Sequence, residues 1–145
     1  MDEKMTNKEL TCKIFEHDGF VKLTGAEVIS LTESSAIVRA RIGEEHQNAN
    51  GCVQGGMLYT VADFAFALLG NYLHPVTVTQ SGQISYIRAA YTSVITATAK
   101  EIVRAGHNTV SEVIVRDEQD QIVCVCTFNG FVKDVDRKEL QKKYE

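Results

Sequence analysis

Apolar and polar positions alternate along this chain with two different periods, and the changes of period separate predicted helices from predicted strands. Residues 6–17 are polar to amphipathic and predict a short N-terminal helix. Segments 26–30 and 34–42 alternate with a period of two, which predicts strands. A loop rich in Gly and Asn, residues 43–56, then leads into a predicted helix from about Gly56 to Leu69.

This predicted helix has almost no polar face. Eleven of the thirteen residues from Met57 to Leu69 are apolar, so we expect the helix to be covered on nearly all sides. Four alternating segments joined by short turns follow it: 76–88, 93–104, 108–117 and 121–132. Such a series is typical of an antiparallel meander. The pattern therefore predicts an α+β fold of the hot-dog layout, in which a sheet of about six strands wraps around a central helix.

Composition adds limits on the kind of protein. The 145 residues fit one domain, 1–145, with a charged segment at about 134–145 that we expect to be a solvated tail, with a frayed helix as the alternative. The net charge of -4 and the scattered basic residues argue against nucleic acid or an anionic membrane as partner. The apolar runs are shorter than a membrane span.

Cysteine and histidine usage points to free thiols and gives little support for a metal site. The four cysteines lack paired ligand spacing and the N-terminus lacks a secretory signal, so we expect a cytoplasmic protein. Cys124 and Cys126 alternate in an apolar run, which favours burial as small hydrophobes. The histidines form no ligand pair, so no metal is expected.

One carboxylate interrupts the apolar helix. With histidine counted as neutral, Asp63 is the only formally charged side chain from His46 to Ile87. Burial of an unpaired carboxylate costs free energy and raises its pKa. Asp63 could hydrogen-bond Thr60 or cap nearby backbone. Alternatively, it is a general base or nucleophile that faces a substrate cavity.

Polar groups around the helix favour the catalytic interpretation. Gly55 and Gly56 lie at the expected helix N-terminus, where free N–H groups could bind an oxyanion, although a simple tight turn would use the same residues. Asn48 offers an amide that donates and accepts, but Asn is also a common turn residue. The following strand carries a polar row: Thr77, Thr79, Ser81, Gln83 and Ser85. This row is a solvent face unless it lies near Asp63, where a hydroxyl could orient a water.

The spacing along the helix limits how these groups combine. Gly55 and Asp63 are eight residues apart, which is about 12 Å along a helix axis. A base and oxyanion donors must both lie within about 3 Å of one reacting group. If both serve one site, they come from two chains. The catalytic hypothesis therefore predicts a homodimer with two equivalent sites.

The stretch HQNANGCVQGG, residues 46–56, followed by VADFAF, residues 61–66, resembles the hot-dog-fold acyl-CoA thioesterases of the phenylacetic-acid-degradation type. That family has His-x-Asn-x-x-Gly-x-x-His-Gly-Gly and then an Asp seven residues after the last Gly. The segments 20–28 and 84–100 and the last strand extend the similarity over most of the chain. The departure is Gln54, which stands where the family usually has His and cannot carry a proton at neutral pH.

The resemblance implies thioester hydrolysis and a role for each matched residue. Asp63 would be the general base or nucleophile, assisted by the hydroxyl of Thr79. The Gly55 N–H would polarise the thioester carbonyl, with Gly56 supporting the turn. Asn48 would hold the nucleophilic water or the thioester.

The resemblance also implies the remaining substrate contacts and the assembly. Gln54 would contact the substrate, and Arg88 is a candidate for a coenzyme A phosphate, unless it is a surface charge at a strand end. Coenzyme A would enter only as part of the substrate, with no other cofactor. We expect a homodimer that pairs into a dimer of dimers. We expect the substrate to have an aryl or medium-chain acyl group. Four side chains of the helix suggest room for such an acyl group or form plain core: Met57, Tyr59, Phe64 and Phe66.

Two alternatives to hydrolysis remain open at this stage. A non-catalytic acyl-CoA-binding module would keep the pocket and lose turnover, and Gln54 motivates this reading. A hydratase on the same fold has less support, because such enzymes generally pair a His with an acid and no His follows the pattern here.

Overall fold

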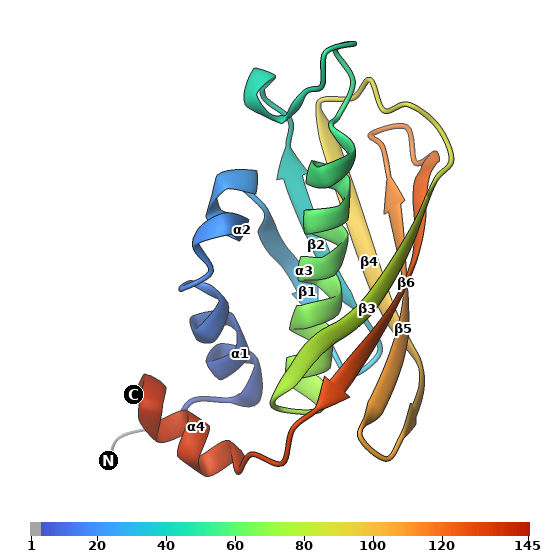
Figure 1. The fold of residues 1–145 in the computed structure, drawn as a ribbon. Helices are drawn as coiled ribbons and strands as arrows, with labels where there is room; N and C mark the ends of the chain where they lie inside the picture. The colour runs from blue at the N-terminus through green and yellow to red at the C-terminus, as the bar shows by residue number, and fades with distance from the viewer. Residues whose placement is uncertain (1–3) are drawn as a thin grey trace.

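The computed structural model describes residues 4–145 and shows one antiparallel sheet with a long helix lying on it (Figure 1). The strands are β1 (Glu27–Leu31), β2 (Ala36–Arg41), β3 (Thr77–Tyr86), β4 (Val94–Ala105), β5 (Asn108–Arg116) and β6 (Ile122–Val132). The helices are α1 (Asn7–Phe15), α2 (Gly19–Thr24), α3 (Gly55–Leu73) and α4 (Arg137–Tyr144), with a 3₁₀ turn η1 (Glu44–His46). The predicted α+β hot-dog fold is confirmed.

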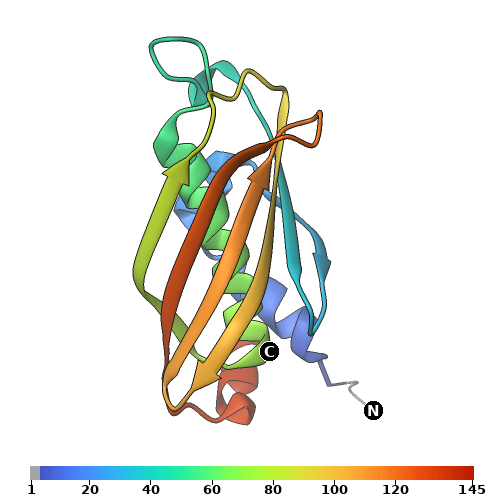
Figure 2. The same ribbon diagram turned by 90° about the vertical axis from the view of Figure 1, so that its right-hand side faces the viewer.

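The six strands form one sheet in the order β1-β2-β4-β5-β6-β3, with antiparallel neighbours throughout. Each strand begins and ends within two residues of its predicted segment. Figure 2 looks onto the face of the sheet that points away from α3. Strand β4 follows β3 in the chain, but β3 does not pair with it. Strand β3 pairs with β6 and forms the edge of the sheet opposite to β1, so one side of β3 is unpaired.

Helix α3 packs against β2, β3, β4 and β5, and its length exceeds the prediction by four residues at the C-terminal end. Small side chains on the strands, such as Ala97 and Ala99, let the helix approach the sheet closely. The expectation that α3 is covered on nearly all sides is wrong for the single chain. A stripe at intervals of three or four residues is only partly covered: Gly56, Tyr59, Thr60, Asp63 and Ala67. We call this set the open stripe.

The N-terminal segment contains two helices where one was expected. The predicted helix at 6–17 is α1, and Thr6 and Glu9 form a capping box at its start. The second helix, α2, was missed by the sequence reasoning because it spans only six residues. Its signals are local: the side chain of Asp18 accepts a hydrogen bond from the Val21 N–H at 3.0 Å, and Gly25 ends the helix with a positive φ.

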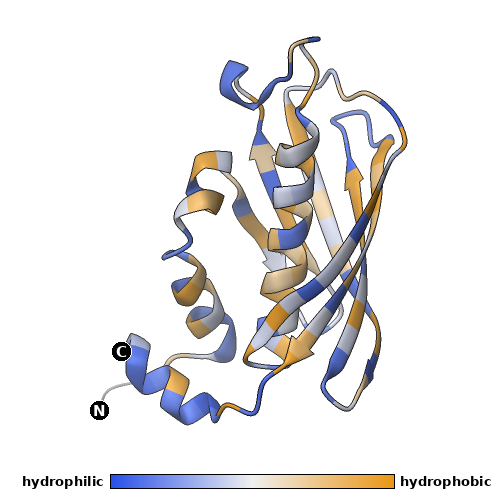
Figure 3. Ribbon diagram, viewed as in Figure 1, coloured by the Kyte–Doolittle hydropathy of each residue, from blue (hydrophilic) through white to orange (hydrophobic). Residues whose placement is uncertain are grey.

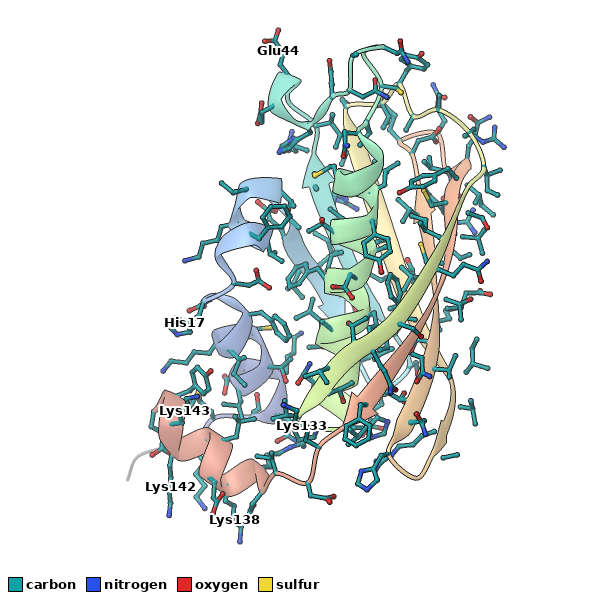
Figure 4. All side chains as sticks on the ribbon, viewed as in Figure 1. His17, Glu44, Lys133, Lys138, Lys142 and Lys143 are labelled. Carbon is teal, nitrogen blue, oxygen red and sulfur yellow. The ribbon has the colours of Figure 1, made fainter. Side chains whose placement is uncertain are left out.

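In the charged segment at 134–145, residues 137–144 form the helix α4, which was the alternative to the expected solvated tail. The Arg137 guanidinium donates to the Tyr72 carbonyl at 2.9 Å, and Gln141 donates to the Met5 carbonyl at 3.2 Å, so α4 is docked beside α1. Figure 3 colours α4 as mostly hydrophilic, and in Figure 4 Lys138 and Lys142 point away from the rest of the molecule. Helix α4 therefore covers the N-terminal helix without burying apolar side chains of its own.

Cysteine burial follows the prediction. Cys124 and Cys126 lie on β6 with exposed fractions of 0% and 1%, and burial raises the pKa of their thiols to about 11 and about 12. All four cysteines are free thiols. Among the helices of the described residues, none has both the length and the apolar character that crossing a membrane requires.

Candidate active site

Asp63 and Thr79 are brought together by the packing of α3 against β3. Asp63 lies on the open stripe, and the Thr79 hydroxyl donates to its Oδ1 at 2.7 Å. The Thr60 hydroxyl instead donates to the Gly56 carbonyl at 2.7 Å, so the Asp63–Thr60 hydrogen bond considered from sequence does not form. The carboxylate is therefore held by a strand hydroxyl beside a partly open surface.

The surroundings of Asp63 raise the pKa of its carboxyl group above the value that an aspartate has in water. Burial raises the pKa of the Asp63 carboxyl, the hydrogen bond from Thr79 opposes this by stabilising the charged form, and the negative charge of Asp18 adds a smaller increase. A carboxyl whose pKa is raised toward neutrality is a better proton acceptor once it is ionised. The site thus combines a half-buried carboxylate with one orienting hydrogen bond.

For a reaction in which Asp63 is the base, the pH dependence follows from this setting. Turnover requires the ionised carboxylate, so kcat/KM falls as the pH drops through the raised pKa, and this acid limb lies above the ordinary value of 3.8. Thr79→Val removes the opposing hydrogen bond and is expected to move the limb to higher pH. The pH–rate profiles of the two proteins test this. An unshifted limb would show that Thr79 does not act on the base.

The start of α3 presents free backbone donors. The side-chain oxygen of Gln54 accepts a hydrogen bond from the Met57 N–H at 3.2 Å and caps the helix. Within residues 4–145, the N–H groups of Gly55 and Gly56 find no acceptor. The hydroxyl of Tyr86 donates to the Gly55 carbonyl at 2.9 Å and fixes the end of β3 against this turn. The geometry suits an anion or a polarised carbonyl oxygen at the helix N-terminus.

Asn48 shapes the loop that precedes α3. Its side-chain oxygen accepts hydrogen bonds from the Asn50 N–H at 2.9 Å and the Cys52 N–H at 3.3 Å. Its amide nitrogen donates to the Cys52 Sγ at 3.1 Å. Of the two roles considered from sequence, the turn role is the one that the single chain shows.

A cleft of about 390 Å³ brings together three of the predicted site residues, Asn48, Gly55 and Arg88. The Arg88 Nε donates to the Ile122 carbonyl at 2.8 Å, which holds the side chain at the end of β3. Its terminal nitrogens donate to no group within residues 4–145 and remain available to a ligand. Tyr86 also lines this cleft, and the sequence reasoning missed it. The one sequence feature that could have indicated Tyr86 is its aromatic ring in the otherwise polar segment that forms β3.

Other predicted residues lie elsewhere. Gln54 and Gly56 line a second cleft between α2 and the start of α3. Asp63 and Thr79 line neither cleft. Asp63 lies about 12 Å from Gly55 along the helix axis. The single chain therefore holds the Asp63 carboxylate and the backbone donors at two separate places. In the part of the chain that the structure describes, no group of three His, Cys, Asp or Glu side chains could hold a metal ion.

Two curated proteins show sequence similarity. A candidate esterase of Archaeoglobus fulgidus is 31% identical over 90 residues, which are 61% of this chain and 58% of that protein. The acyl-coenzyme A thioesterase PaaI of Escherichia coli is 26% identical over 113 residues, which are 77% of this chain and 81% of that protein. The chain thus spans little more than half of the first relative and most of the second. No protein-family model matches the chain.

Solved structures with the same fold include three instructive neighbours. The Escherichia coli PaaI protein superposes with a TM-score of 0.80 at 22% identity, covering 88% of this chain and 96% of that one. The TT0310 protein of Thermus thermophilus gives 0.75 at 30% identity, covering 81% and 99%. A hypothetical thioesterase of Streptococcus pneumoniae, in a structure with coenzyme A, gives 0.77 at 24% identity, covering 83% and 95%.

A six-stranded antiparallel sheet around one helix, shared with the Escherichia coli PaaI structure, defines a hot-dog protein, and this chain has a lone carboxylate on that helix and free amides at its start. Sequence similarity covers 58% of the Archaeoglobus relative and 81% of the Escherichia coli relative. The chain belongs to the PaaI-type hot-dog proteins.

Proposed function

We propose that the protein hydrolyses acyl-CoA thioesters to a free acid and coenzyme A. The observation that carries the proposal is the setting of Asp63 on the open stripe. Its half-buried carboxylate has a raised pKa and accepts a hydrogen bond from the Thr79 hydroxyl, which orients it. Support also comes from the Escherichia coli relative, whose name is acyl-coenzyme A thioesterase, and from the Streptococcus neighbour with coenzyme A.

The proposed chemistry uses a carboxylate and backbone amides. Asp63 accepts a proton from a water molecule that attacks the thioester carbonyl carbon, or its own oxygen attacks that carbon and water later hydrolyses the acyl-enzyme. The Gly55 N–H stabilises the negative charge that develops on the carbonyl oxygen, with support from the Gly56 turn. The bond to sulfur then breaks and releases the thiolate of coenzyme A. These steps call for no cofactor beyond the coenzyme A of the substrate.

The proposed active unit is a homodimer. Asp63 and Gly55 of one chain are too far apart for one carbonyl group, so a second chain must supply one of them. The single chain offers two surfaces for this purpose: the open stripe of α3 and the unpaired edge of β3. Unpaired strand edges are templates for association. The free thiols fit a reducing compartment such as the cytoplasm, which is part of the proposal.

A further association of dimers into a tetramer is also proposed. Ile37, Ile114 and Val125 are half-buried and lie in one row across the face of the sheet that points away from α3. An apolar row on an otherwise polar face suits contact with a second dimer.

Gln54 supports a second candidate function, a non-catalytic acyl-CoA-binding module. Its side chain is a helix cap, and it supplies no proton where the family usually has His. The Gly55 amide and the Asp63–Thr79 pair are nevertheless in place, which favours hydrolysis.

The test is thiol release from a panel of acyl-CoA thioesters, aromatic and aliphatic, together with calorimetric binding of the same compounds. Enzymatic release well above spontaneous hydrolysis supports the thioesterase. Binding without release would replace it by the binding module, and neither binding nor release would reject both.

A further inference from the structure

The N-terminus of α3 lies between two clefts of different character. The first contains Asn48, Tyr86 and Arg88, and it ends at Gly55. The second has a volume of about 500 Å³ and lies between α2, η1 and α3. Most of its surface is apolar and comes from residues such as Phe20, Leu23 and Met57, while Glu45, His46 and Gln47 give it a polar side. The backbone amides of Gly55 and Gly56 thus separate a cleft with a free guanidinium from an apolar one.

The apolar cleft exposes large side chains that a folded domain normally covers. Phe20 is 65% exposed and Leu23 is 71% exposed, and both belong to α2 at the mouth of the cleft. Exposed apolar side chains gathered around a concave surface mark a binding site more often than isolated ones do. The volume falls in the range of about 300 to 1,000 Å³ that is typical of small-molecule pockets.

Hydrogen bonds through His46 hold the two walls of the apolar cleft together. The Gly43 N–H donates to His46 Nδ1 at 3.0 Å, so Nδ1 accepts and the proton resides on Nε2. That Nε2–H then donates to the Leu23 carbonyl at 3.0 Å. The last turn of α2 is therefore tied to η1, and the position of Leu23 is set by the loop that leads into α3.

The apolar cleft adjoins the start of α3, where the thioester carbonyl is proposed to bind. Gly56 and Thr60 line it, and both belong to the open stripe, the surface proposed to meet the second chain. Gln54 lines it as well, next to the free Gly55 N–H. A thioester carbonyl held at that N–H would have the apolar cleft on one side and the Arg88 cleft on the other.

We propose that the cleft formed by Phe20, Leu23, Met57 and Thr60 receives the acyl group of the substrate, while the coenzyme A arm leaves through the cleft with Arg88. This inference rests on the proposed thioesterase function and adds the direction of the substrate and the class of acyl group. An apolar lining of this size selects medium-chain aliphatic or aryl groups over acetyl. Phe20 and Leu23 are then specificity-determining residues.

Three aromatic residues of α3 do not line this cleft: Tyr59, Phe64 and Phe66. Phe66 stacks on Phe128 with ring centroids 5.4 Å apart, and Tyr59 packs edge-on against the same ring at 5.5 Å. Phe64 packs against Phe15 at 5.8 Å. Phe64 and Phe66 are core, and Tyr59 is half-buried against the core. Of Met57, Tyr59, Phe64 and Phe66, Met57 alone lines the cleft.

The experiment compares Leu23→Gln with a matched control, Ile102→Gln. Both replace an exposed aliphatic side chain by an uncharged polar one of similar size, and Ile102 is 61% exposed and lines neither cleft. We expect the ratio of kcat/KM for octanoyl-CoA to that for acetyl-CoA to fall about tenfold in Leu23→Gln, because one lost apolar contact in a pocket has this scale of effect. The control keeps the wild-type ratio. Phe20→Gln provides a second variant with the same expectation.

Calorimetric binding of both acyl-CoAs and the oligomeric state separate the possible failures. If the wild type binds but does not hydrolyse, the proposed function fails, and a tenfold loss of octanoyl-CoA binding relative to acetyl-CoA in Leu23→Gln still supports the acyl cleft. If hydrolysis occurs and the ratio is unchanged, the acyl cleft is overturned and the function stands. Equal loss for both substrates together with dissociation would identify the cleft as an interface between copies, and no binding by the wild type would overturn both.

Discussion

Asp63→Asn is expected to lower kcat for acyl-CoA hydrolysis by about two to four orders of magnitude, the range for a positioned general base. The asparagine keeps the shape of the side chain and can still accept the hydrogen bond from Thr79. It cannot accept a proton or attack as a carboxylate. The affinity for intact acyl-CoA should change little, because neither cleft is lined by Asp63.

Folding stability provides an independent readout of the same variant. The raised pKa means that folded Asp63 holds its proton over a pH range in which the unfolded chain has released it. The stability of the wild type therefore decreases as the pH rises through that range, and the decrease is complete above the folded pKa. Asp63→Asn removes this loss, so its free energy of unfolding at neutral pH should exceed that of the wild type. A less stable variant would show that the carboxylate supports the fold, as a structural cap does.

Mixing two inactive variants is expected to restore activity if the site is shared between chains. Gly55→Pro removes the N–H that would stabilise the oxyanion, and proline is tolerated at the first position of a helix. Gln54 precedes it with ψ of 137°, an extended conformation that proline accepts in its neighbour. Loss of one such donor is expected to lower kcat by about two to three orders of magnitude.

Equal amounts of Gly55→Pro and Asp63→Asn, refolded together, should recover about a quarter of wild-type activity. Half of the dimers are then mixed, and one of the two sites in each mixed dimer has both Asp63 and the Gly55 N–H. A site within one chain would give no recovery. Gly55→Ala is the matched control: its Cβ would also stand 3.1 Å from the Tyr86 hydroxyl, but it keeps the N–H, so its activity separates crowding from the loss of the donor.

The candidate site could be predicted in part because its members are unusual in their local setting. An isolated carboxylate among apolar residues identified Asp63, and the Gly pair marked the start of α3. The partner of Asp63 depended on the family resemblance, since five residues of the β3 row share the same polar character. Only the packing of α3 on β3 distinguishes Thr79 among them.

The sequence by itself determined the strands, the central helix and the burial of Cys124 and Cys126, because periodicity reports which side of each element meets the core. The tertiary structure decided what lies beside what. It placed β3 next to β6, docked α4 on α1, left a stripe of α3 open and set an apolar cleft beside the Gly55 turn. These features depend on contacts between segments far apart in the chain, and a local alternation of apolar and polar residues contains no information about which distant segment provides the contact.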